Sequence, residues 1–247
     1  MRWKRLVGGV TTVWCLLMQA AAGAEIRVFT PRAGATVLMQ LQSDYQKQTG
    51  DMLIIMSDSG PNLVAKVEKG EPFDILIAGA PIINAEIAKG SLVADTRKNI
   101  FRSSLGIIVR AGAPKPDIGS VDKLTEALLA ARSIAFLKGV NGVESIVKQL
   151  GLEERLKATL RPQTRDVVSD LVASGEVDLA ITAVTQAFTT SGVELVGRLP
   201  AEAQFTIQFV GAVGTNSTAA EQARALLGYL SSPEAMRAIT SQGLDVD

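Results

Sequence analysis

The residues best suited to chemistry lie in short polar turns, each of which follows a predicted apolar strand. Hydroxyl groups and backbone N–H groups at the starts of helices can together bind a small anion with little net charge. Ten residues in such turns are our candidates for ligand contacts: Thr30, Arg32, Ala33, Ser59, Gly60, Asn141, Gly142, Asp166, Val167 and Thr182. Within any one turn, a Ser, Thr or Asp is more simply explained as a helix N-cap. The ligand interpretation gains because such turns occur in both halves of the chain.

Arg32 bears on the kind of anion that these turns would bind. A guanidinium group binds a carboxylate through two parallel hydrogen bonds, whereas a tetrahedral oxyanion site built from neutral donors needs no arginine. Arg32 therefore favours an organic carboxylate, unless its side chain points to solvent. Asp58, in the next turn, would repel an anion unless it pairs with Arg32 or faces away. Lys138 and Arg165 would add positive charge only if they face the same site.

The sequence lacks the residue types on which most catalytic and metal sites depend. It contains no His, and its single Cys is Cys15, close to the N-terminus. These absences exclude Ser-His-Asp catalysis, Cys-His catalysis and thiolate metal sites. A pair of carboxylates or a Ser-Lys pair remains open, but no spacing singles one out. We therefore expect a binding protein, not an enzyme, with no cofactor and no metal.

The N-terminus predicts export. A short basic segment at 1–5 precedes an apolar run at 6–18, and small residues at 20–24 fit a cleavage site before Glu25. This pattern is typical of a secretory signal peptide over residues 1–24. Its removal takes away three of the 25 basic residues and leaves a net charge of −3. With no basic field remaining, we expect no binding to nucleic acid.

The hydrophobic periodicity predicts an α/β protein with mostly parallel sheets. The expected strands are residues 25–29, 52–56, 74–79, 105–109, 134–136, 178–181, 193–196 and 205–213. The expected helices are residues 34–49, 59–70, 81–89, 120–131, 142–150, 164–174, 217–230 and 233–241. The strand at 52–56 is uniformly apolar, so we expect it to be buried on both faces. Ligands of such sheets bind beyond the C-terminal ends of the strands, where the polar turns lie.

Two stretches of the chain resemble each other. Residues 63–77 and 168–181 each read as an amphipathic helix, a Gly, an Asp and an apolar strand. A helix-to-strand unit that occurs twice predicts two similar lobes, and small ligands commonly bind between lobes. The simpler explanation is that Gly-Glu after a helix is an ordinary C-terminal stop.

Several longer strings extend this pattern into a family resemblance. They are Ile26-Arg27-Val28-Phe29, the segment 63–75, the segment 109–118, the segment 192–200 and Leu230-Ser231-Ser232-Pro233-Glu234-Ala235. Together they resemble the molybdate-binding-like type II periplasmic solute-binding proteins of ABC importers. The resemblance implies a periplasmic monomer that captures a small anion for an ABC permease complex in the inner membrane. It also implies the two-lobed periplasmic binding protein type II fold, with lobe one at 25–104 plus 205–247, lobe two at 105–204, and two crossing strands.

The resemblance also suggests a site. Members that bind molybdate use a Ser in the first turn, a Ser in the second, backbone amides of two turns in lobe two, and a Tyr hydroxyl. Here the first turn offers Thr30, Arg32 and Ala33, and Ser59 matches the second Ser. The amides map to Asn141-Gly142 and Asp166-Val167, and Thr182 or Ala183 replaces the Tyr. We therefore expect an organic carboxylate ahead of molybdate or tungstate. A periplasmic sensing module without a transporter is the alternative role.

Overall fold

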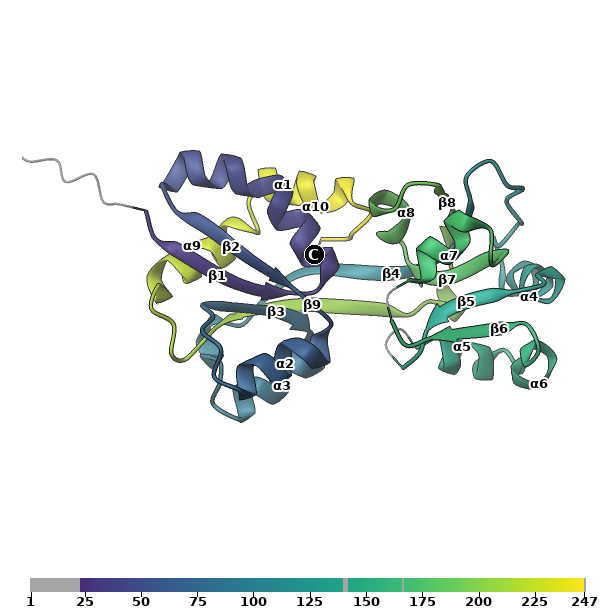
Figure 1. The fold of residues 1–247 in the computed structure, drawn as a ribbon, viewed down its shortest axis with the longest axis horizontal. Helices are drawn as coiled ribbons and strands as arrows, with labels where there is room; N and C mark the ends of the chain where they lie inside the picture. The colour runs from purple at the N-terminus through teal and green to yellow at the C-terminus, as the bar shows by residue number, and fades with distance from the viewer. Residues whose placement is uncertain (1–22, 140–141, 166, 247) are drawn as a thin grey trace, which may run out of the picture.

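The computed structural model describes residues 23–139, 142–165 and 167–246, which form two α/β lobes side by side. The predicted signal peptide therefore lies almost entirely outside the described residues, as do Asn141 and Asp166. Two long strands, β4 (Lys98–Arg110) and β9 (Thr206–Val213), run through the waist of the molecule (Figure 1). Within the described ranges, no helix is both long and apolar enough to cross a membrane.

Lobe one is a mixed sheet between two layers of helices. Its parallel strands are β1 (Glu25–Thr30), β2 (Met52–Ser57) and β3 (Ile75–Gly79), in the order β2-β1-β3-β9-β4 with β9 antiparallel to β3 and to β4. The helices α1 (Arg32–Thr49), α9 (Ala220–Tyr229) and α10 (Pro233–Ser241) pack on one face. The helices α2 (Gly60–Glu68) and α3 (Ala80–Ala88) pack on the other, and the short η1 (Ala94–Thr96) leads into β4.

Lobe two repeats this plan with the second half of β4. Its parallel strands are β5 (Ile134–Leu137), β6 (Leu160–Gln163) and β7 (Leu179–Ala183), and β4 lies between β7 and β8 (Val193–Arg198), antiparallel to both. The helices α4 (Val121–Ala130), α5 (Val143–Gln149) and α6 (Glu153–Leu156) cover one face. The helices α7 (Val168–Ser174) and α8 (Gln186–Thr189) cover the other, and η2 (Ala201–Ala203) leads towards β9.

The aspartates of the two similar stretches, Asp74 and Asp178, have the same structural role in the two lobes. The Asp74 carboxylate accepts the backbone N–H of Arg27 at 2.8 Å, which ties the start of β3 to the neighbouring parallel strand β1. The Asp178 carboxylate accepts the backbone N–H of Arg132 at 2.9 Å and ties the start of β7 to β5. In strand order, β1, β2 and β3 thus correspond to β5, β6 and β7.

Three predictions about strands are corrected by the structure. The strand at 52–56 is not buried on both faces, because β2 is an edge strand whose Met52, Ile54 and Met56 are exposed. The strand predicted at 105–109 is only the second half of β4, whose more polar first half lies in lobe one. The helix predicted at 164–174 begins only at Val168, and an unpredicted edge strand, β6, precedes it, where an edge position tolerates Pro162.

The C-terminal segment 243–246 lies against the waist (Figure 1). Arg102 of β4 and Asp245 exchange two backbone hydrogen bonds, at 2.7 and 2.9 Å. The Asp245 carboxylate also accepts two hydrogen bonds from the Arg198 guanidinium of lobe two, at 2.8 and 3.1 Å, and one from Ser104 at 3.1 Å. The end of the chain is therefore bound both to a crossing strand and to lobe two.

Candidate ligand-binding site

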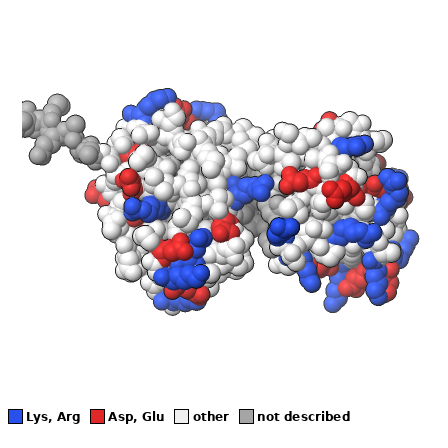
Figure 2. Space-filling model, in the orientation of Figure 1, with Lys and Arg blue, Asp and Glu red and all other residues white. Residues whose placement is uncertain are grey.

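The strand register brings the polar turns of both lobes to the facing edges. Gly79 at the end of β3 pairs with Phe209 of β9, and Ala183 at the end of β7 pairs with Leu105 of β4. Because β1 and β2 run parallel to β3, and β5 and β6 parallel to β7, all six strands end towards the waist. Figure 2 shows a notch between the lobes, with acidic and basic side chains on both sides. We call this space the interlobe cleft.

The first turn presents one charged side chain. Arg32 is the first residue of α1 and is exposed at the facing edge. Thr30 is fully buried, and its Oγ1 donates to the carbonyl of Pro31 at 3.3 Å. A methyl group on Gly34 would lie 2.0 Å from Thr30 Oγ1, so the absence of a side chain at Gly34 lets α1 approach β1 closely. Ala33 is half-buried against the core of lobe one. Of the three predicted residues, Arg32 is thus the one whose side chain is exposed at the facing edge.

The second turn is organised around its own cap. Ser59 precedes α2, and its Oγ accepts the N–H of Asn62 at 3.4 Å. The Asp58 carboxylate accepts hydrogen bonds from the backbone of Ser59 and from the side chain of Asn62, both at 2.7 Å. These donors offset the negative charge that an incoming anion would meet. Gly60 follows as the first residue of α2.

In the described part of the lobe-two turns, backbone N–H groups already donate hydrogen bonds within their own turns. Gly142, with φ of +65°, precedes α5, and the N–H of Gly139 donates to Glu144 at 2.9 Å. The N–H of Val167 donates to the carbonyl of Arg165 at 2.9 Å, so it already has an acceptor within its turn. Lys138 and Arg165 are exposed.

Thr182 and a cluster of hydrogen-bonded polar side chains are buried in lobe two. Thr182 is buried on β7 opposite Gly106 of β4, which leaves it 3% exposed. Nearby, Ser169 of α7 donates to the side-chain oxygen of Gln186 of α8 at 2.9 Å, and Thr190 donates to Ser169 at 3.0 Å. This cluster joins the two helices that follow β6 and β7. The two bonds to Ser169 span 17 and 21 residues, a spacing that carries no sequence signal.

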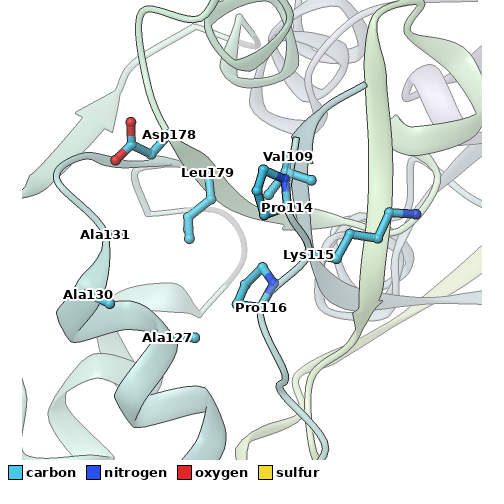
Figure 3. A pocket seen from close by; sticks show the side chains of 9 residues that line it. All are labelled: Val109, Pro114, Lys115, Pro116, Ala127, Ala130, Ala131, Asp178 and Leu179. Carbon is cyan, nitrogen blue, oxygen red and sulfur yellow. The ribbon is translucent and has the colours of Figure 1, made fainter. Parts of the chain in front are cut away.

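A separate cavity lies at the far end of lobe two (Figure 3). It measures about 360 Å³ and is lined mainly by apolar side chains, among them Val109, Pro114, Pro116 and Leu179. Asp178, at its rim, points away from it (Figure 3), because its carboxylate is paired with Arg132 at 2.8 Å. This end of β7 is opposite to the end that faces the cleft. Among the described residues, no cluster of three acidic, His or Cys side chains could hold a metal ion.

Comparison with known proteins connects this arrangement to solute binding. A sequence profile of the bacterial extracellular solute-binding proteins matches residues 26–245. An aconitate isomerase from a Pseudomonas species is 31% identical over 208 residues, covering 81% of this chain and 79% of that protein. The fold is similar to the periplasmic molybdate-binding protein of Azotobacter vinelandii, with a TM-score of 0.74, 20% identity and coverage of 90% and 99%. It is also similar to L-phospholactate-bound PEB3 of Campylobacter jejuni, with a TM-score of 0.70, 14% identity and coverage of 90% and 100%.

Proposed function

This chain belongs to the bacterial extracellular solute-binding proteins, and on that premise we propose that it captures a small organic carboxylate in the interlobe cleft for uptake by an ABC importer. The observation that carries the proposal is the position of Arg32. It begins the longest helix of lobe one at an edge where six strands end, and its side chain is exposed there. A guanidinium group at a helix N-terminus offers a carboxylate both a planar pair of donors and a favourable helix dipole.

Two relatives support an organic ligand. Aconitate, named in the curated relative described above, carries carboxylate groups. PEB3, which has the same fold, was solved with L-phospholactate, also an organic anion. Ser59, Gly60, Gly142 and the turn at Thr182 would complete the site from both lobes. The permease complex in the inner membrane is the expected partner of the loaded protein.

Molybdate or tungstate is the alternative ligand, since the molybdate-binding protein shares the fold. A role in sensing without a transporter would use the same cleft. The buried hydroxyl of Thr30 speaks against the oxyanion, because it is turned under α1 and donates to a carbonyl instead of facing the cleft. A tetrahedral oxyanion bound by neutral donors would need such hydroxyl groups in the open.

Isomerisation of an unsaturated carboxylate is a second candidate function, and the 31% identity to an aconitate isomerase favours it. Interconverting geometric isomers by moving a proton requires a positioned base. Without His, that base would have to be a carboxylate, a hydroxyl or a lysine. Incubating the protein with each isomer of aconitate and recording proton NMR spectra tests this directly. Turnover that survives purification to homogeneity would establish an enzyme.

The ligand class is tested by a thermal-shift screen of dicarboxylic and tricarboxylic acids, molybdate, tungstate and sulfate, followed by calorimetry. A ligand at about a hundred times its dissociation constant adds about 2.7 kcal/mol of stability, which raises the melting temperature measurably. We expect organic acids to shift the melting temperature and the inorganic oxyanions to leave it unchanged. A shift with molybdate alone would overturn the carboxylate proposal and favour the oxyanion.

A further inference from the structure

The crossing segment presents apolar side chains to the turns of both lobes. Phe205, just before β9, is 38% exposed, and its ring lies over Gly142: a methyl group there would be 2.7 Å from Cδ2 of the ring. Ile207 lies two residues later, on the same face of the strand. Its side chain lies against Gly79, which precedes α3: a methyl group on Gly79 would be 3.7 Å from Ile207. One face of this segment thus contacts a helix start in each lobe.

A buried hydroxyl that has no partner among the described residues lies beside Ile207. Ser103 of β4 pairs directly with Ile207 of β9, and directly paired residues place their side chains on the same face of a sheet. Ser103 is only 3% exposed, and its Oγ has no hydrogen-bond partner among the described residues. Buried hydroxyl groups are normally bonded, because an unsatisfied one loses its hydration without compensation. A group supplied by a ligand would satisfy it.

We propose that Phe205, Ile207 and Ser103 form the floor of the interlobe cleft and select an organic anion with a hydrocarbon segment. The hydrocarbon segment packs on Phe205 and Ile207, and a polar group of the ligand bonds the Ser103 hydroxyl. This inference rests on the proposed function and adds to it a reason for discrimination. A tetrahedral inorganic oxyanion has no apolar surface to bury on such a floor, whereas each methylene of an organic acid gains from burial.

The first test compares affinities by calorimetry, with trans-aconitate and molybdate as the probes. We expect Phe205→Ala to weaken trans-aconitate binding about tenfold or more, since an aromatic side chain contributes a large apolar area. Phe205→Leu should recover part of that loss. Met39→Ala is the matched control, because Met39 is a large exposed apolar side chain on α1, 55% exposed, outside the proposed floor. Equal affinity in wild type and Phe205→Ala would overturn the floor while leaving the proposed function intact.

Ser103→Ala separates a ligand role from a structural one. Because the hydroxyl is buried and unsatisfied, its removal should leave the melting temperature of the free protein unchanged or slightly raised. If it binds ligand, the same substitution should weaken trans-aconitate binding several-fold. Unchanged affinity in this variant would remove Ser103 from the floor.

A spectroscopic test avoids any dependence on affinity. From Glu25 onwards the sequence contains no Trp, so Phe205→Trp in the exported protein carries a single indole at the floor. Its fluorescence should change on addition of trans-aconitate and saturate with ligand, while Met39→Trp should not respond. A response at neither position, in protein that calorimetry shows to bind trans-aconitate, would overturn the floor. Binding of molybdate and of no organic acid would instead overturn the proposed function, and the floor with it.

Discussion

At the scale of single residues, Arg32 carries the sharpest consequence of the carboxylate proposal. Arg32→Ala should cost about 2–5 kcal/mol of binding to an organic acid, because it removes a charge-assisted pair of hydrogen bonds and leaves the anion under-paired. Arg32→Lys should recover only part, since an ammonium group lacks the planar fork. The free energy of unfolding should barely change, because Arg32 is exposed.

Calorimetry on the Arg32 variants needs a control that removes an equivalent charge elsewhere. Arg237→Ala serves, because Arg237 is also exposed and belongs to lobe one, on α10. It should bind ligand like the wild type. If Arg32→Ala did so too, Arg32 would not contact the ligand, and the neutral-donor oxyanion site would become the better interpretation.

How far the sequence predicts individual residues depends on what decides their orientation. The capping role of Ser59 can be predicted from the sequence, because capping is local: its Oγ accepts the N–H of Asn62, three residues later. The burial of Thr30 is not readable, since it depends on how closely Gly34 lets α1 pack on β1. The unpaired hydroxyl of Ser103 is not readable from the sequence either, because Ser103 is placed by strand pairing with Ile207, more than a hundred residues away.

At the scale of elements, the two equivalent aspartates should differ in their effect on stability. Asp74 is 2% exposed and accepts hydrogen bonds from Arg27, Ser217 and Ala219, so Asp74→Ala leaves buried donors unsatisfied and should cost about 3 kcal/mol. Asp178 pairs with the largely exposed Arg132, and Asp178→Ala should cost about 1 kcal/mol. Urea denaturation of the two variants measures both values. Equal losses would show that burial does not set the difference.

Asp178 should also make the stability depend on pH. Its hydrogen bonds from the Arg132 side chain, followed by the bond from the Arg132 backbone, lower the pKa of its carboxyl group. A lowered pKa in the folded state stabilises the protein above the unfolded value of about 3.9 and ceases to do so as the pH falls through the folded value. The stability difference between wild type and Asp178→Asn should therefore be present at pH 7 and shrink at pH 3. A difference that is constant with pH would mean that the ion pair contributes nothing.

Most elements are predictable because their signals are local, and the exceptions have tertiary causes. The helix predicted at 233–241 has the bounds that the structure shows, and its start is fixed locally: Ser232 accepts the N–H of Ala235, and Pro233 is its first residue. The exposure of β2 is not readable, since its uniform apolarity cannot show that it lies at the edge of the sheet. The first half of β4 was missed because its alternation is broken by a bulge between Asn99 and Phe101. Sheet order and edges are properties of the assembled lobe.

At the scale of the whole molecule, two crossing strands predict a hinge. The turns on the facing edges can approach one another by rotation about β4 and β9, so a ligand that contacts both lobes should favour the closed arrangement. Small-angle X-ray scattering with a saturating ligand found in the screen should give a smaller radius of gyration than scattering without it. An unchanged radius with proven binding would contradict hinge closure. An organic acid that does not shift the melting temperature serves as the control for solvent effects.

The topology sets the order in which the two lobes can be completed as the chain leaves the ribosome. Lobe two is built around one continuous stretch of chain, whereas the sheet of lobe one takes its strand between β3 and β4 from β9, at residues 206–213. An emerging chain can thus complete lobe two before β9 is available to pair with β3 in lobe one. Pairing that joins such distant segments is slow, because a long loop must close before any contact is gained. Strand β1, which is synthesised before the other described strands, therefore belongs to the lobe that matures last.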